Sequence, residues 1–370
     1  MFSTHAQRVD RWLGTETAEA LSRAMKEWYG PPIALAGVPG NVWAARGGDF
    51  VGRIKAGETM SAVDFAVERL KRAWKTTARR QLYTCNTGFS SLSDLISEAT
   101  NGKRREYPFS KSGPTGVVNV SSSLWRLGAS PPAGSAPGNA AAGTAFDSTS
   151  TGGFPFTNPS NPDTQHFVSG YPLASVGANT LLLYDLLFGV NKTMASTGTE
   201  AVTGVPSRYQ STTASNPDYV GGNFLFVQVG GTALAATAHN WTVCQYTDQA
   251  GNTGNNLPSL AGNASAIVDR LDHPAGQWFA PLATGDTGIK ALTQMQCDAS
   301  VATGVVWFMI GHPIAFMPCP IANVVCVADG INTAFNLTRI FDSACLAFLE
   351  ICKSATTATT YSGSFTTVAG

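Results

Sequence analysis

The chain has 370 residues, more than a single hydrophobic core usually serves. It carries 24 basic and 24 acidic residues, so its formal net charge is zero, and only 13% of it is charged, about half the usual share. A monomer with so few charged side chains tends to associate, because net charge and scattered ionic groups keep proteins apart. The composition therefore argues against a solitary soluble protein and favours an assembled structural component.

The zero balance hides an asymmetry along the chain. Residues 1–111 hold 17 basic and 11 acidic residues, a net of +6, whereas residues 112–370 hold 7 and 13, a net of −6. Charged residues near the start (Arg8, Asp10, Arg11) exclude the apolar core of a secretory signal. No stretch reaches the roughly 18 uninterrupted apolar residues of a membrane span. We expect a protein made in the cytoplasm that does not enter a membrane.

The first 110 residues predict a basic region with helices. Thr15 caps a helix that ends at Gly30, a second helix runs over 61–80, and Ser91 with Asp94 opens a third that reaches Ala99. A solvated or acid-paired helix face and a nucleic-acid contact both explain the basic side of the second helix. The basic residues that we select there as subunit or shell contacts are Arg69, Arg72, Lys75, Arg79 and Arg80.

Residues 111–170 are rich in Pro, Gly, Ala and Ser, as in "SPPAGSAPGNAAAGTAFDSTSTGGFPF". Such a stretch buries too little apolar area to fold alone. It predicts a linker or an extended arm laid over a neighbouring subunit, and its spaced aromatic residues favour the arm. We select Phe154 and Phe156 as further contact residues.

Residues 171–370 predict a β-sandwich domain. The run "NTLLLYDLLFGV" fits a buried strand or helix, and periodicity alone leaves both open. In "HNWTVCQYTD", alternation places Trp241, Val243 and Gln245 on one face and Thr242, Cys244 and Tyr246 on the other. Further runs are β-branched or aromatic and end at turn formers, which is typical of an antiparallel sandwich or jelly roll: "GNFLFVQVGG", "GIKALTQMQC", "ATGVVWFMIGHPIAF", "ANVVCVADG" and "SACLAFLEICKSA".

Motifs for catalysis and metal binding are weak throughout. The five histidines are scattered, the seven cysteines form no CxxC pair, and no phosphate-binding loop or nucleophile elbow occurs. The densest polar cluster, Asp269 to His273, lacks a nucleophile partner, and we interpret it as a structural loop with internal ion pairs. Buried thiols are the expected state of the cysteines, with disulfides as the alternative. We expect no enzyme activity, no cofactor and no metal.

Two stretches, "FPFTNPSNPDTQHFVSGYPLASVGANTLLLYDLLFGVNKTMASTGTEAVTGVPSRYQ" and "RIFDSACLAFLEI", resemble virion structural proteins of tailed bacteriophages. The resemblance covers roughly residues 150 to 355. It implies a capsid decoration or cement protein, located in the virion and assembled in the host cytoplasm. The implied partners are copies of this chain, as a trimer or other homo-oligomer, and the major capsid protein or other virion proteins, with non-specific contact to packaged DNA as an addition.

The expected fold is mainly β, with a jelly-roll-like antiparallel β-sandwich at 171–370, preceded by a smaller helical region at 1–110 and the arm at 111–170. Two alternatives to decoration stay open. The chain could form the shell itself as the major capsid protein, although that fold usually has a long spine helix. It could also be a receptor- or glycan-binding module of a tail fibre or baseplate, with sugar-stacking rings among Trp241, Tyr246, Trp278 and Trp307.

Overall fold

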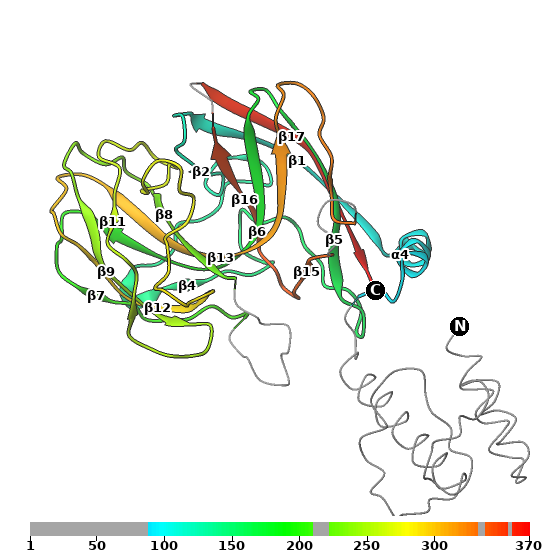
Figure 1. The fold of residues 1–370 in the computed structure, drawn as a ribbon, viewed down its shortest axis with the longest axis horizontal. Helices are drawn as coiled ribbons and strands as arrows, with labels where there is room; N and C mark the ends of the chain where they lie inside the picture. The colour runs from blue at the N-terminus through cyan, green and yellow to red at the C-terminus, as the bar shows by residue number, and fades with distance from the viewer. Residues whose placement is uncertain (1–87, 210–221, 332–336, 354–356) are drawn as a thin grey trace, which may run out of the picture. The chain divides into compact units, whose positions relative to one another are not determined.

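The computed structural model describes residues 88–209, 222–331, 337–353 and 357–370 (Figure 1). The chain divides into two compact units, Met1–Cys85 and Asn86–Gly370, and all described residues belong to the second. This second unit begins upstream of the boundary that we placed at residue 110. The helices predicted at 15–30 and 61–80 lie outside the described residues.

Strands account for 44% of the structure and helices for 6%, and the strands pair in antiparallel sheets, which confirms the mainly β sandwich. Sheet 1 has the order β14 (Ala328–Asp329), β5 (Gln165–Ala174), β17 (Ala358–Ala369), β1 (Arg104–Thr115) and β3 (Ala129–Ser130), with β15 (Arg339–Ile340) on β5. Sheet 2 has the order β2 (Ser122–Ser123), β16 (Leu346–Cys352), β6 (Asn179–Thr193), β13 (Val305–Cys319) and β8 (Phe224–Val229), with β4 (Thr144–Ala145) on β6. Sheet 3 has the order β10 (Asn255–Asn256), β9 (Asn240–Asp248), β12 (Ile289–Cys297) and β7 (Glu200–Ala201), with β11 (Leu260–Ala261) on β9.

One α-helix, α4 (Leu92–Glu98), lies within the described residues. The Ser91 hydroxyl accepts a hydrogen bond from the Asp94 backbone N–H at 3.1 Å, which confirms the predicted N-cap. Asp94 in turn accepts from the backbone N–H of Ser90 at 2.9 Å. A distorted helical turn (Ala99–Lys103) follows α4, and a single 3₁₀ turn (Ala140–Ala142) precedes β4.

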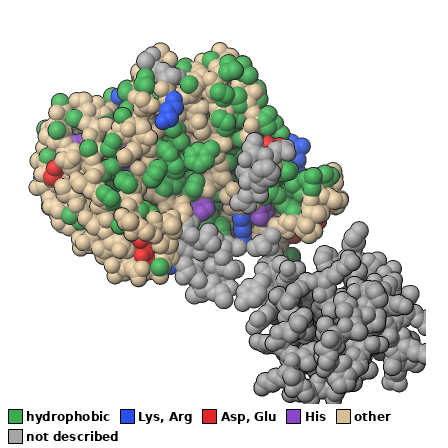
Figure 2. All heavy atoms as spheres, viewed as in Figure 1, with side chains coloured by type: hydrophobic (Ala, Val, Ile, Leu, Met, Phe, Trp, Pro, Cys, Tyr) green, Lys and Arg blue, Asp and Glu red, His purple; other side chains and the backbone are tan. Residues whose placement is uncertain are grey.

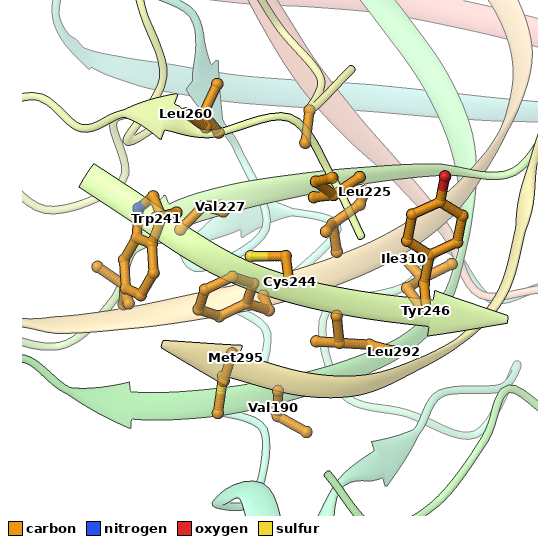
Figure 3. Packing of buried hydrophobic residues seen from close by; sticks show 14 of the residues in the cluster. Val190, Leu225, Val227, Trp241, Cys244, Tyr246, Leu260, Leu292, Met295 and Ile310 are labelled. Atoms are coloured by element: carbon orange, nitrogen blue, oxygen red, sulfur yellow. The ribbon is translucent and has the colours of Figure 1, made fainter. Parts of the chain in front are cut away.

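Sheet 2 is shared by two sandwiches. Its longest strands, β6 and β13, pair from Asn179 opposite Cys319 to Thr193 opposite Val305. One face of these strands packs against sheet 1 at one end and against sheet 3 at the other, forming two separate cores. Figure 3 shows the second of these cores, between β9 and β12 of sheet 3 and strands of sheet 2.

The opposite face of sheet 2 carries a third apolar cluster, which includes Leu182, Tyr184 and Leu186 of β6. The run "NTLLLYDLLFGV" is therefore a strand that is covered on both faces. Burial on both faces explains why the run is apolar without alternation. Without alternation, hydrophobic periodicity cannot distinguish a strand from a buried helix.

The predicted faces of β9 are wrong at one end. Among residues 241–246 the buried side chains are Trp241, Cys244 and Tyr246, whereas Thr242 is exposed. Trp241 pairs with Cys297 of β12 and Val243 pairs with Gln296, so Thr242 is an extra residue in a β-bulge. A bulge puts two residues opposite one and reverses the alternation, which brings Trp241 to the same core as Cys244.

Residues 111–170 pack within this second unit and contribute to its core. Phe154 lies against three aromatic rings of sheets 1 and 2, with centroids 4.9 Å from Phe365, 5.3 Å from Phe348 and 6.2 Å from Tyr107. Phe156 is buried in the same core. The segment is rich in Pro and Gly, yet it buries aromatic side chains against strands on both sides of it in the sequence.

Candidate assembly surface

The ion pairs that we expected within the polar cluster at Asp269 to His273 are made with distant residues instead. Asp269 pairs with Arg126, 2.8 Å from its Nε. Asp272 is fully buried, and its Oδ2 lies 2.9 Å from His239 Nε2 and accepts from Trp241 Nε1 at 2.8 Å. These contacts fasten the loop to sheet 3 and to the segment that follows β2.

The histidines of this region are held in place by hydrogen bonds. Burial lowers the pKa of His273 to about 4, and its Nε2 accepts from the Val227 backbone N–H at 2.8 Å. Burial also disfavours the charged form of His239, but the Asp272 carboxylate outweighs it and raises the pKa of His239. The Nε2 atom of His273 attaches the loop to β8, and the Nε2 atom of His239 attaches the same loop, through Asp272, to the start of β9.

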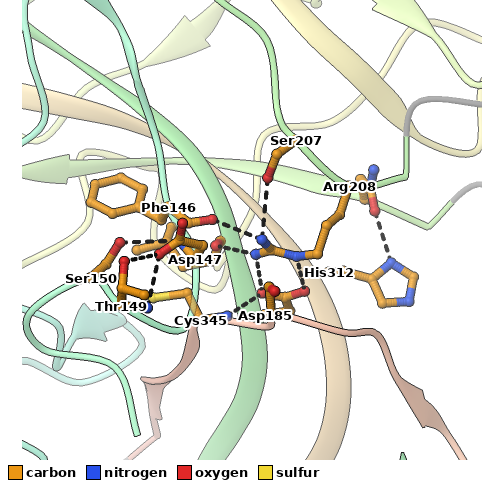
Figure 4. Close-up of polar contacts among 12 residues, drawn as sticks. Phe146, Asp147, Thr149, Ser150, Asp185, Ser207, Arg208, His312 and Cys345 are labelled. Carbon is orange, nitrogen blue, oxygen red and sulfur yellow. Dashed lines mark hydrogen bonds and ion pairs between the residues drawn. The ribbon is translucent and has the colours of Figure 1, made fainter. Parts of the chain in front are cut away.

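A buried ion pair lies where the two cores of sheet 2 meet (Figure 4). The carboxylate of Asp185 on β6 accepts from Arg208 Nε at 2.9 Å and from Arg208 Nη2 at 2.6 Å, and Asp185 is fully buried. Arg208 also donates to the carbonyl oxygens of Phe146 and Leu186. Burial opposes the charge of Arg208, but the Asp185 carboxylate raises its pKa. The pair holds residues 202–209 against sheet 2.

His312 of β13 lies directly opposite Asp185 in the sheet register. Its ring stacks on Tyr209, with centroids 4.3 Å apart, and its Nδ1 is 2.8 Å from Asn223 Oδ1. Burial lowers the pKa of His312 to about 4, so the ring is neutral at neutral pH. The junction between the two cores thus combines one ion pair with a neutral aromatic stack.

Metal ligands do not gather anywhere in the described ranges: no group of three or more His, Cys, Asp or Glu side chains there could hold an ion. Five of the six cysteines that the structure describes are buried, and Cys326 is partly exposed. In the same residues, no helix has the length and apolar character needed to cross a bilayer.

The contact residues selected from the sequence fall into two groups. Arg69, Arg72, Lys75, Arg79 and Arg80 lie outside the described residues. Phe154 and Phe156 are only 2% and 6% exposed, which corrects their predicted role: they are core residues, and their side chains do not face a neighbouring subunit. Spacing alone misled us, because isolated aromatic residues in a Pro/Gly-rich segment can reach into the chain's own core.

Two basic residues near the start of β1, Lys103 and Arg104, have acidic partners within the chain. Lys103 lies 2.7 Å from both Glu98 and Asp163, and Arg104 pairs with Glu106 at 3.2 Å. Lys103 and Arg104 are therefore paired with acidic side chains, which is one of the two explanations considered for the basic region. The other explanation was a surface that contacts nucleic acid.

Three of the four aromatic residues considered for sugar stacking are buried, namely Trp241, Tyr246 and Trp307. Trp278 is partly exposed and packs edge-on against two exposed rings, with centroids 4.7 Å from Phe279 and 5.6 Å from Phe316. Only Trp278 of the original four therefore stays accessible to a ligand.

The most exposed apolar stretch follows β13. Four of the thirteen large hydrophobic residues that are exposed in the described part fall within residues 321–327, which we call the edge segment: Ile321 (58%), Val324 (45%), Val325 (56%) and Val327 (54%). Hydrophobic side chains gather at the top of Figure 2, over the orange loop that follows β13 in Figure 1. The exposed Tyr171 of β5 borders this segment.

The edge segment runs along the outer side of β5. The backbone N–H of Asn323 donates to the Ala174 carbonyl at 2.8 Å, and that of Cys326 donates to the Pro172 carbonyl at 3.0 Å. The pairing continues into β14, where Ala328 lies opposite Gly170. Sheet 1 therefore ends in an apolar border.

The sequence held a signal for this surface that we did not use. The run "ANVVCVADG" predicted a strand, and only its end, Ala328–Asp329, is a regular strand. Residues 320–328 contain no charged side chain, and the Val-rich window lacks the alternation of a strand with one solvent face. A run of residues without charge and without hydrophobic alternation, next to turn-forming residues, indicates either a fully buried strand or an exposed assembly surface.

Comparison with known proteins assigns no family to the chain, since neither a family model nor a curated protein matches it.

Proposed function

We propose that this chain is a non-enzymatic structural subunit that assembles with copies of itself into a particle shell. The observation that carries the proposal is the edge segment, whose apolar side chains are exposed in the single chain and carry no charge. Contiguous exposed apolar surface on a protein marks an interaction site. The low charge of the whole sequence supports the same role, because a surface buried by assembly needs few ionic groups.

The particle that we propose is the virion of a tailed bacteriophage, on the basis of the sequence resemblance. A capsid decoration or cement protein is favoured over the major capsid protein, because the α-helix of the described residues has only seven residues and makes no long spine. The polar clusters of these residues support a structural role, since each one joins strands or loops and leaves no paired acid and nucleophile to act on a substrate.

Light scattering of the purified full chain tests this function. We expect a discrete mass that is a multiple of 38.7 kDa and that persists on about tenfold dilution, because apolar interfaces of obligate oligomers dissociate little at micromolar concentration. A mass of 38.7 kDa at every concentration would contradict the proposal that copies of the chain assemble by themselves.

A further inference from the structure

The backbone of the edge segment has one side turned to β5 and one side turned away from it. The N–H groups of Asn323, Cys326 and Gly330 donate to carbonyls of β5. From Cys326 onward the contacts to β5 fall on alternate residues, Cys326, Ala328 and Gly330. Because backbone groups alternate in an antiparallel pair, this register directs the N–H and C=O of Val325 and Val327 away from β5. No backbone bond to Val325 or Val327 is found among the described residues. The outer side of the segment is an open β-edge.

This edge has a regular strand of only two residues, β14, but it lacks the side chains that usually protect an edge. Edge strands are normally blunted by charged side chains, by proline or by a covering element. Between Pro320 and Asp329 there is no charged residue and no further proline. Val325 and Val327 add β-branched side chains, which suit pairing in a sheet. An open edge with these properties is a template for another strand.

The chemistry of the edge fits a second copy of the same edge. An isologous contact places the same surface on both sides, so any charge on it would face a like charge. The edge segment carries no charge, and the whole chain has a net charge of zero, so two copies meet without repulsion. A nucleic acid or an acidic protein would need basic residues here, and the segment has none.

We infer that two copies of this chain pair edge to edge through residues 321–327, so that their two copies of sheet 1 form one continuous antiparallel sheet across a two-fold axis. The N–H and C=O groups of Val325 and Val327 make the hydrogen bonds between the copies, and the valine and isoleucine side chains bury each other. This inference rests on the proposed function, because it names the partner and the geometry for one assembly contact.

The test uses two opposite charges at one position, Val325→Lys and Val325→Glu, in the full chain. Val325 is 56% exposed, so either side chain is accommodated in the folded single chain. Each variant alone is expected to raise the dissociation constant on the order of 100-fold, since each contact then holds two like charges without partners. Mixing the two variants is expected to restore assembly, because only an isologous contact brings position 325 of one copy near position 325 of another. The matched control is Val205→Lys, at a position that is 53% exposed and lies outside the edge segment.

Light scattering of the wild type, both variants, their mixture and the control gives separable outcomes. Wild-type assembly that both Val325 variants weaken and their mixture restores would establish the two-fold edge contact. Wild-type assembly that the variants leave unchanged would overturn the edge pairing and leave the proposed function standing. Weakening without rescue in the mixture would also overturn it, in favour of a different surface as the partner of the edge. A monomeric wild type would refute the proposed function itself.

Discussion

Replacing Arg208 by alanine is expected to lower the free energy of unfolding by about 3–5 kcal/mol, because the change leaves the carboxylate of Asp185 buried without its counter-charge. Asp185 is fully buried and takes two hydrogen bonds from Arg208, and after the change the described residues supply it one donor, the Cys345 backbone N–H. Arg208 also satisfies the carbonyl oxygens of Phe146 and Leu186, and its loss removes both of these bonds. Urea denaturation of the wild type and the variant measures the difference.

The double variant Asp185→Leu with Arg208→Met shows how much of the loss in the free energy of unfolding comes from a buried charge without its partner. Apolar replacement of both partners of a buried pair is often neutral or stabilising, so we expect the double variant to recover the part of the loss that comes from the lone charge, while the Phe146 and Leu186 carbonyls stay without the Arg208 donor. Arg104→Ala is the control, since its pair with Glu106 is more than half exposed on both sides, and we expect a change within about 1 kcal/mol. A loss in the double variant equal to that of Arg208→Ala would contradict this account.

Stability is expected to fall as the pH rises through the range in which Glu350 ionises. Glu350 of β16 is 1% exposed, and burial raises its pKa to about 7 although the Tyr361 and Thr359 hydroxyl groups favour its ionised form. The Tyr361 hydroxyl donates to Glu350 Oε1 at 2.7 Å and so links sheet 1 to sheet 2. Between pH 4.5 and about 7 the unfolded chain has released this proton and the folded chain keeps it, so the folded state binds more protons and loses stability as the pH rises. A shift of this size corresponds to about 3 kcal/mol.

Glu350→Gln is expected to remove this part of the pH dependence, because the amide stays neutral and can still accept from Tyr361. The measurement is the free energy of unfolding of the wild type and of the variant from pH 4.5 to 8. The difference should grow in favour of the variant by about 3 kcal/mol over this range and then level off. Glu106→Gln, at a side chain that is 52% exposed, is the control and should follow the wild type. Parallel curves for the wild type and Glu350→Gln would show that Glu350 ionises normally in the folded chain.

The sequence predicted the β fold well because its strands are marked by β-branched runs between turn formers. The cap of α4 was also predictable, since Ser91 and Asp94 act within one turn of chain. The bulge at Thr242 was not predictable, because it depends on the register between β9 and β12, which strand alternation does not contain.

The contacts between segments far apart in the sequence were the main failure of prediction. Phe154 looked like an arm residue, but the rings that bury it come from β1, β16 and β17. Asp269 and Asp272 looked like members of one loop, and their partners, Arg126 and His239, lie elsewhere in the chain. The edge segment appeared as an ordinary strand, because its uncharged run without alternation fits a fully buried strand as well as an exposed border.

Hydrogen exchange of the backbone amides of residues 321–327 distinguishes a paired edge from an open one. In the single chain Val325 and Val327 donate no backbone hydrogen bond to another described residue, so their N–H groups should exchange at nearly the rate of an open chain. In the assembled wild type we expect slow exchange at both amides, and fast exchange again in the Val325→Lys variant, because pairing with a second copy gives these groups their hydrogen-bond acceptors. Fast exchange at Val325 and Val327 in an assembled wild type would show that the edge stays open, and would contradict the account.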